Sequence, residues 1–302
     1  MREFTDNQYL NRYRYDVKSQ FGEDGIIEKI FEIIPKASQN HFSCEFGAWD
    51  GLHCSNTYNL ITNKDWHGVL IEANKKKFKD LKKTYANVSN VTLINEFINI
   101  KGPNTLDQLL SKTDLPEDFD FLSIDIDSTD YHIWESLMEY RPKLVVIEFN
   151  PCIPDNIDYV QAADPSKNHG TSLLAMNKLA KRKGYELICV NAENAFFVDK
   201  KYFPLFGIKD NSIASLKYYR EPLQVFQLFD GTLVFQGEPH HSLVWYSLPV
   251  DFNKLQVLPK FIRSARLPWG GNFFLRGCMK LLRMYRQKNW KGLDADPGAW
   301  KM

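Results

Sequence analysis

The stretch CEFGAWDG, residues 44–51, contains the pattern from which the fold of this 302-residue chain is predicted. An apolar run, residues 41–46, leads into its first glycine, and a second apolar run, residues 68–71, ends at Glu72. A glycine-containing turn between a strand and a helix lets the backbone approach a ligand, while the free amide groups of the helix point into the same crevice. The stretch therefore predicts a ligand-binding turn after the first strand of an α/β sheet.

Short apolar runs alternate with amphipathic stretches from about residue 41 to residue 200, which is typical of parallel strands joined by crossover helices. Because the runs are apolar throughout, we expect helices to cover both faces of the sheet. The sequence predicts a Rossmann-like α/β fold with a seven-stranded, mostly parallel sheet and a C-terminal appendage. The predicted strands are residues 41–46, 68–71, 91–94, 119–126, 144–149, 185–190 and 195–198.

The chemistry of the turn indicates which kind of cofactor it binds. An acidic residue at the end of the second strand, here Glu72, accepts hydrogen bonds from both hydroxyls of a ribose. The dinucleotide fingerprint requires glycine at positions 49 and 52, where this chain has Trp49 and Leu52, so a pyrophosphate-containing cofactor is disfavoured. S-adenosylmethionine (SAM) has no phosphate, and its ammonium and sulfonium groups suit the carboxylates of Glu45 and Asp50.

This combination resembles the FkbM-like branch of the class I methyltransferases, in which an acidic-x-Gly-Ala turn precedes an Ile-Asp-(Val/Ile)-acidic-Gly motif. The matching segments are residues 45–48, 69–72 and 120–127, within a likeness that runs from about residue 19 to residue 203. Trp49 stands where the family usually has a small residue or Asn, and Ser128 stands where it usually has glycine. The resemblance implies a SAM-dependent methyltransferase. The residues expected to contact SAM are Glu45, Gly47, Ala48, Asp50, Gly51, Glu72, Ala73 and Asp125.

The resemblance also implies an acceptor, a hydroxyl on a sugar, a glycolipid or another small metabolite. Carboxylates gather where the fourth and fifth predicted strands end, with Asp125 and Asp127 after one and Glu148 at the other. Neighbouring strands lie roughly 5 Å apart, so these charges need a counterion or a proton. In the metal-free interpretation Asp125 or Asp127 is the general base. Asp130 is interpreted as the cap of a helix over residues 131–137.

A divalent cation is the alternative to the general base. Asp125, Glu148 and Asn150 resemble the ligand set of metal-dependent catechol-type methyltransferases, and Mg²⁺ would hold the acceptor hydroxyl there. His169 follows the long loop after the fifth strand and is predicted to open the next helix. It is a third candidate catalytic residue, as a base or a substrate contact, with helix capping or packing as its alternative role.

The chain divides into three predicted parts. Residues 1–40 form an N-terminal helical segment, in which apolar residues at helical spacing end before Pro35. Residues 41–216 form the SAM-binding methyltransferase domain, and residues 217–302 form the appendage, which begins with a hairpin at Asp230-Gly231. The start of the chain lacks the order of a signal peptide, so we expect a cytoplasmic protein, with peripheral membrane contact as an alternative.

The net charge of +1 hides a basic region in the appendage. Residues 260–291 contain nine cationic residues and no Asp or Glu, and they predict a basic amphipathic helix. We expect this helix to cover the core or to form a subunit contact of a homo-oligomer; an anionic lipid surface or substrate is the alternative. Nucleic acid is disfavoured, because no stacking motif accompanies the charges.

Two alternatives to a methyltransferase follow from the same residues. The first is a non-catalytic, methyltransferase-like binding module that acts through its basic C-terminal region. The second is a nicotinamide oxidoreductase, which Trp49 and Leu52 disfavour. The partner expected for the enzyme is a small-molecule or glycan acceptor.

Overall fold

The computed structural model describes residues 4–218, 224–228 and 233–236, together with the single residues Gly277, Lys280, Leu281 and Met284. Its contacts divide the chain into two compact units, one up to Tyr219 and the other from Arg220 to Ala299. The first unit holds the large sheet and the candidate site. The second contains a two-stranded sheet.

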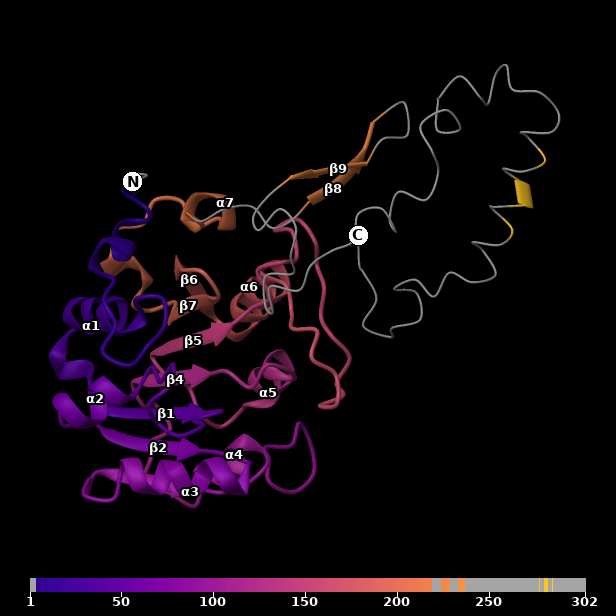
Figure 1. Ribbon diagram of the computed structural model, residues 1–302. Helices are drawn as coiled ribbons and strands as arrows, with labels where there is room; N and C mark the ends of the chain where they lie inside the picture. Colours follow the sequence, from indigo (N-terminus) through magenta and orange to yellow (C-terminus); the bar gives the residue numbers. More distant parts are fainter. Residues whose placement is uncertain are drawn as a thin grey trace. The chain divides into compact units, whose positions relative to one another are not determined.

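The first unit is built on a seven-stranded sheet with the strand order β3-β2-β1-β4-β5-β7-β6. The first five strands pair in parallel, as the matching arrow directions of β1, β2, β4 and β5 in Figure 1 show, whereas β7 runs antiparallel to both β5 and β6. The predicted mostly parallel α/β sheet is therefore confirmed. The strands are β1 (Phe42–Phe46), β2 (His67–Ile71), β3 (Val91–Ile94), β4 (Phe121–Ile124), β5 (Leu144–Glu148), β6 (Tyr185–Val190) and β7 (Asn194–Asp199).

Both faces of the sheet are covered. Every residue of β4 and the first four of β5 are buried, which a sheet open to water on one face does not allow. The N-terminal segment belongs to this same core, because Leu10, Ile26 and Ile30 of its helices are completely buried in it. The helices of this unit are η1 (Tyr9–Tyr13), α1 (Glu23–Ile33), η2 (Lys36–Ser38), α2 (Tyr58–Asn63), α3 (Lys75–Thr84), α4 (Leu106–Leu110), α5 (Asp130–Ser136), α6 (Leu173–Lys183), η3 (Phe203–Phe206) and α7 (Ile213–Leu216).

Two predicted boundaries at the site are wrong. The fourth strand ends at Ile124 rather than at residue 126, because the N–H of Ile126 donates to the side chain of Asp130 instead of to a neighbouring strand, and Asp127 then has a positive φ of 59°. The helix after the long loop begins at Leu173, with Ser172 as its cap, so His169 lies in the loop and does not open the helix. The side-chain oxygen of Ser172 accepts the N–H of Ala175, which satisfies one free amide of the first turn.

The predicted hairpin of the appendage is present as β8 (Gln224–Gln227) and β9 (Leu233–Gln236), which pair antiparallel. Most of residues 260–291 lie outside the described residues, so the basic amphipathic helix and its subunit or membrane contacts stay predictions. Within the part of the chain that the structure describes, no helix has the length and apolar character needed to cross a membrane.

Candidate functional site at the carboxyl edge of the sheet

The order of the strands defines where a ligand crevice lies. We call the end of the sheet at which β1, β2, β4 and β5 finish the carboxyl edge. The chain winds from β1 outward to β3 and then returns to place β4 on the other side of β1, so the winding direction reverses between these two strands. In open α/β sheets the ligand binds outside the carboxyl ends of the strands at such a reversal. The loops after β1 and β4 are therefore the first candidates.

The loops after β1 and β4 touch each other at Gly47. Its φ is 78°, and a Cβ atom built on it would lie 1.7 Å from the carbonyl oxygen of Asp125. No side chain fits in that space, so glycine is required both for the backbone conformation and for the contact. The predicted turn thus lies directly against the end of β4, which brings Asp125 to the same place.

Glu72 fixes the turn to the end of β2. One of its carboxylate oxygens accepts the backbone N–H of Trp49 at 2.9 Å, and the other accepts the N–H of Asn74 at 2.6 Å. The side chain is only 8% exposed, yet each carboxylate oxygen has a second lone pair with which to accept a ribose hydroxyl. Ala73, the next predicted contact, is exposed beside it. The arrangement is compatible with the predicted nucleoside site.

Glu45 holds the loop that follows the turn. Its carboxylate accepts hydrogen bonds from the hydroxyls of Ser55 and Thr57 at 2.7 Å and 2.6 Å and from the N–H of Asn56 at 2.8 Å. Burial raises the pKa of Glu45, and these three donors act in the opposite direction. In the structure Glu45 therefore holds residues 55–57 in place. Its contact with a cofactor stays a prediction.

The end of the turn is held by its own residues. The carboxylate of Asp50 accepts the N–H groups of Leu52 and His53 and contacts the His53 ring nitrogen Nδ1 at 2.6 Å. Burial raises the pKa of Asp50, but these hydrogen bonds outweigh it and the net direction is downward. Gly51 has a φ of 73° and lies against α3, where a Cβ atom would come within 2.6 Å of Leu81. Asp50 is therefore an ionised residue at the margin of the crevice.

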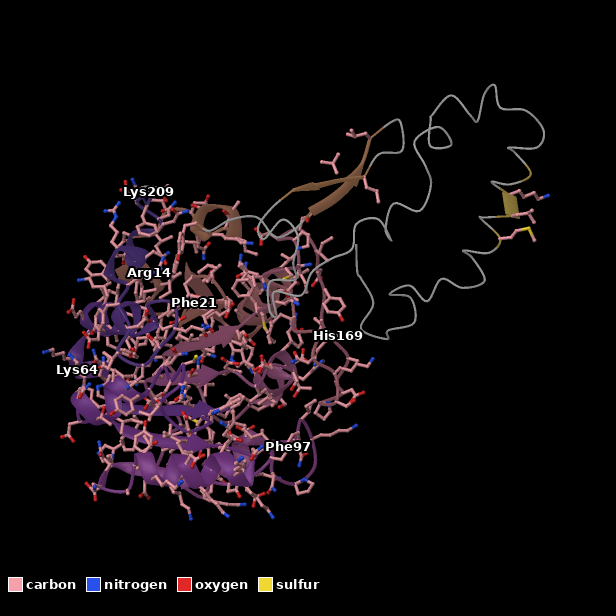
Figure 2. The ribbon with its side chains drawn as sticks, in the orientation of Figure 1. Arg14, Phe21, Lys64, Phe97, His169 and Lys209 are labelled. Atoms are coloured by element: carbon pink, nitrogen blue, oxygen red, sulfur yellow. The ribbon has the colours of Figure 1, made fainter. Side chains whose placement is uncertain are left out.

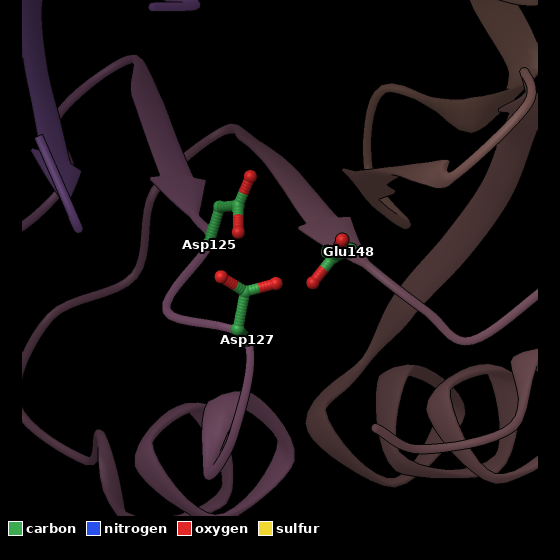
Figure 3. Close-up of side chains that lie close together, drawn as sticks. All are labelled: Asp125, Asp127 and Glu148. Carbon is green, nitrogen blue, oxygen red and sulfur yellow. The ribbon is translucent and has the colours of Figure 1, made fainter. Parts of the chain in front are cut away.

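Three carboxylates meet beyond the turn, and we call Asp125, Asp127 and Glu148 the acidic cluster. One oxygen of each lies within 4.8 Å of the others (Figure 3). Asp125 and Asp127 come from the loop after β4, and Glu148 is the last residue of β5. The three carboxylates thus lie close together, as the sequence predicts.

The acidic cluster is electrostatically uncompensated. Burial raises the pKa of Asp125 well above its ordinary value, and the neighbouring carboxylates of Asp130, Asp127 and others raise it further. The pKa of Glu148 is raised in the same way, by burial first and then by Asp125, Asp130 and Asp127. The neighbouring charges with the largest effects on these two pKa values are all acids. A cation or a proton is therefore favourable at this place.

Asp130 has a different role from the predicted helix cap. It is the first residue of α5, and its carboxylate accepts the N–H groups of Ile126 and Ser128 at 2.8 Å and 3.0 Å. It thus fixes the loop that contains Asp127 rather than the end of the helix. Burial raises its pKa to about 6, against the effect of these two donors.

Glu193 is an acidic residue at this edge that the sequence analysis missed. It lies in the turn between β6 and β7, and its carbonyl oxygen accepts the N–H of Phe149 at the end of β5. Burial raises the pKa of Glu193 to about 7, with Glu23 and Asp127 as further causes. The turn reaches the carboxyl edge because β7 is antiparallel. The three polar residues Asn191, Glu193 and Asn194 between two apolar runs were the available signal.

Asn150 and His169 lie in the long loop after β5. The side chain of Asn150 donates to the carbonyl oxygen of His169 at 2.7 Å and accepts the N–H of Cys152 at 2.8 Å, so it bonds to its own loop. His169 is exposed (Figure 2), and its Nδ1 lies 3.0 Å from the hydroxyl of Tyr159. Metal ligation by Asn150 and catalysis by His169 stay predictions.

The chain is similar to several proteins of known structure. No family model matches the chain, and no curated protein matches it. The chain is similar to the N-terminal domain of EvdMO1, crystallised in the presence of SAH and D-fucose, at 12% identity and a TM-score of 0.39 over 65% of this chain and 96% of that chain. It is similar to the CMeT domain of the citrinin polyketide synthase at 8% identity and 0.39, over 59% of this chain and about half (51%) of that one. A SAM dependent methyltransferase from Aquifex aeolicus is similar at 13% identity and 0.37, over 65% and 97%.

Proposed function

We propose that this protein is a SAM-dependent methyltransferase whose cofactor lies across the carboxyl ends of β1, β2 and β4. The observation that supports this most directly is the contact of the Gly47 turn with the end of β4, beside Glu72. This contact brings three features together where the strand order reverses: the glycine turn, the Glu72 carboxylate that can accept the hydroxyls of a ribose, and the carboxylate of Asp125. The resemblance to the FkbM-like methyltransferases points to the same cofactor, and the turn lacks the glycines that a pyrophosphate needs.

The residues of the turn suit this cofactor. Glu72 accepts the ribose hydroxyls, and Gly47, which has no side chain, lets the turn lie against the end of β4 beside Asp125. A cationic ligand favours the ionised form of a carboxylate, so the ammonium and sulfonium groups of SAM suit a place beside Asp125, whose pKa is raised by burial and by neighbouring acids. Bound SAM supplies an electrophilic methyl carbon, which the acceptor attacks in line with the breaking C–S bond.

The acceptor in this proposal is a hydroxyl of a sugar, a glycolipid or a small metabolite. As its oxygen bonds to the methyl carbon, its proton passes to a carboxylate of the acidic cluster, for which Asp125 or Asp127 is the candidate. A raised pKa suits this role, since a base is most effective when its pKa approaches the working pH. His169 is the third candidate.

The acidic cluster also fits a divalent cation. It offers three carboxylates with oxygens within 4.8 Å of one another, and hard cations such as Mg²⁺ prefer oxygen ligands. Asp125 and Glu148 would hold the ion, together with Asp127 or Asn150. A bound cation would lower the pKa of the acceptor hydroxyl. In either version the carboxylates hold the acceptor oxygen beside the cofactor.

Isothermal titration with S-adenosylhomocysteine (SAH), the product form of the cofactor, tests the proposal. We expect one binding site per chain at low and at physiological salt. No binding under either condition would overturn the proposed function. Transfer of a ¹³C-labelled methyl group to a panel of sugars, amino sugars and small alcohols, with NMR of the products, distinguishes O-methylation from N-methylation.

The cation is tested separately. If it is required, EDTA abolishes methyl transfer, Mg²⁺ restores it, and SAH binding persists in both conditions. Transfer that is unaffected by EDTA contradicts the metal site and leaves the carboxylate as the base. Asp80, an exposed carboxylate of α3 that pairs with Lys83, offers a matched control as Asp80→Asn.

A further inference from the structure

Trp49 is an unusual residue within the turn that follows β1. Its side chain is 49% exposed, and its φ is 49°, in the left-handed region that L-residues rarely occupy. The Nζ atom of Lys77, in the first turn of α3, lies over the indole at 4.1 Å from the ring centroid. A large apolar ring is thus held in a strained conformation without being part of the core.

Folding does not explain this choice of residue. The turn is anchored by its neighbours, because Ala48 is buried in a cluster with Leu81 of α3 and with Tyr85, which follows that helix, and Gly51 packs on the same two side chains. An L-residue in the left-handed region costs about 1 kcal/mol relative to glycine, which adopts it freely. Glycine at position 49 would therefore suit the backbone better. Other exposed residues, such as Asp65, also have a positive φ, so what points to a ligand at Trp49 is the combination of this conformation with a large exposed ring beside Glu72.

The location of Trp49 indicates which part of a ligand it meets. Its backbone N–H donates to the Glu72 carboxylate at 2.9 Å. The residue that carries the indole is therefore directly bonded to the side chain that, in the proposed function, binds the ribose. Gly47, two residues earlier, is the point of contact with β4. Trp49 therefore stands on the β2 side of the crevice, where the nucleoside half of the cofactor lies in the proposed function.

We propose that the indole of Trp49 forms a wall of the cofactor site and packs against the nucleoside of bound SAM, with Lys77 as the positioning residue that holds the ring. This inference rests on the proposed function, because it assigns a contact to the cofactor named there. A cation over an exposed ring contributes about 0.5–1 kcal/mol, enough to favour one orientation of the indole.

The decisive experiment compares SAH binding by the wild-type chain, Trp49→Gly and Trp49→Phe. Glycine removes the ring and relieves the strain, so Trp49→Gly is expected to unfold at the same or a higher temperature. We expect it to bind SAH about tenfold more weakly, which corresponds to the loss of one stacking contact. Trp49→Phe retains an aromatic face and is expected to restore most of the affinity. A purely structural role predicts unchanged or improved binding by Trp49→Gly.

Tyr13 provides a matched control. It is 43% exposed and has Lys29 over its ring at 4.7 Å, but it lies in η1, away from the turn. Tyr13→Ala is expected to bind SAH as the wild type does. Lys77→Gln is expected to weaken binding about threefold, because the ring loses its support.

Fluorescence gives a readout of direct contact. The chain has seven tryptophans, and the change in emission on adding SAH to the wild type is expected to disappear in Trp49→Phe. Binding by the wild type together with equal affinity in Trp49→Gly overturns this inference alone. Failure of the wild type to bind SAH overturns the proposed function, and the inference with it.

Discussion

A pair of ionisable residues lies at each end of the neighbouring strands β4 and β5. At one end the pair is an acid and a base, and at the other end it is two acids. At the amino edge, Asp120 and Lys143 precede the strands, and their charged atoms lie 2.8 Å apart. Both are buried, and Asp120 also accepts the N–H groups of Asn40 and His41. At the carboxyl edge, Asp125 follows β4 and Glu148 ends β5, and both are acids.

The difference separates a pair that stabilises the fold from a pair that we propose serves a ligand. The charge of Asp120 is neutralised within the fold, so this residue is complete without a ligand. The charges of Asp125 and Glu148 repel each other, and burial raises both pKa values further. A bound cation or cationic ligand would relieve this repulsion. Acidic residues with raised pKa values are for this reason often found at functional sites.

Lys143→Met is expected to lower the free energy of unfolding by about 3–5 kcal/mol, because it leaves the Asp120 carboxylate buried without its partner. Urea unfolding followed by circular dichroism measures the loss. Asp118→Asn is the control, since the Asp118 side chain is 70% exposed and 3.9 Å from Lys143, and it is expected to change stability by less than about 0.5 kcal/mol. Equal losses in the two variants would contradict the distinction.

Glu72→Ala is expected to weaken SAH binding by about 2 kcal/mol, or roughly 30-fold, through the loss of hydrogen bonds to a charged acceptor. Isothermal titration measures the affinity, and a melting curve verifies the fold. Glu72→Gln retains an acceptor oxygen, and we expect it to have an intermediate affinity. An unchanged affinity in Glu72→Ala would remove Glu72 from the site.

Asp125→Asn is expected to stabilise the ligand-free protein at pH 8 by about 1 kcal/mol, because it removes one of several repelling carboxylates. The same variant is expected to lose methyl transfer. Urea unfolding at pH 8 gives the first quantity and labelled-methyl transfer gives the second. Destabilisation at this pH would show that Asp125 is a structural residue like Asp120.

The stability of the ligand-free protein is expected to fall as the pH rises. In the folded chain the pKa of Asp130 is raised to about 6 and that of Glu193 to about 7, whereas unfolded carboxyls titrate near 4. The folded state therefore binds more protons between about pH 4 and pH 7, and its stability declines through that window. Unfolding midpoints at pH 5 and pH 8 measure the slope. If the stability of Asp125→Asn changes less between pH 5 and pH 8, part of the pH dependence comes from the acidic cluster. A stability that increases with pH would contradict the raised pKa values.

Much of the architecture follows from local sequence patterns. The strands near residues 42, 67, 91, 144 and 185 begin within about one residue of the predicted positions, since continuous apolar runs identify buried parallel strands. The convergence of Asp125, Asp127 and Glu148 was also predictable, because parallel neighbours finish at the same edge. The end of β4 was not, since the N–H of Ile126 leaves the sheet and donates to the carboxylate of Asp130, four residues later in the chain.

The residues that local patterns did not reveal depend on long-range pairing. Glu193 reaches the site only because β7 is reversed, which places residue 194 opposite Glu148. The internal bonds of Glu45 arise from the path of the loop before α2, which no periodicity encodes. Likewise, Asp120 and Lys143 are far apart in sequence, and their pairing becomes visible only once β4 and β5 are neighbours.

The reversed strand β7 also has a consequence for how this site can change. Its turn, residues 191–193, brings Glu193 to the carboxyl edge without a crossover helix. Glu23 at the start of α1 accepts hydrogen bonds from Asn191 and Asn194 at 2.5 Å and 3.0 Å, so both ends of the turn are held by one helix. The carboxylate of Glu193 is close enough to Asp127 for that acid to affect the pKa of Glu193. If the proposed function holds, we expect substitutions at residues 192 and 193 to change the surroundings of the acidic cluster without moving a helix.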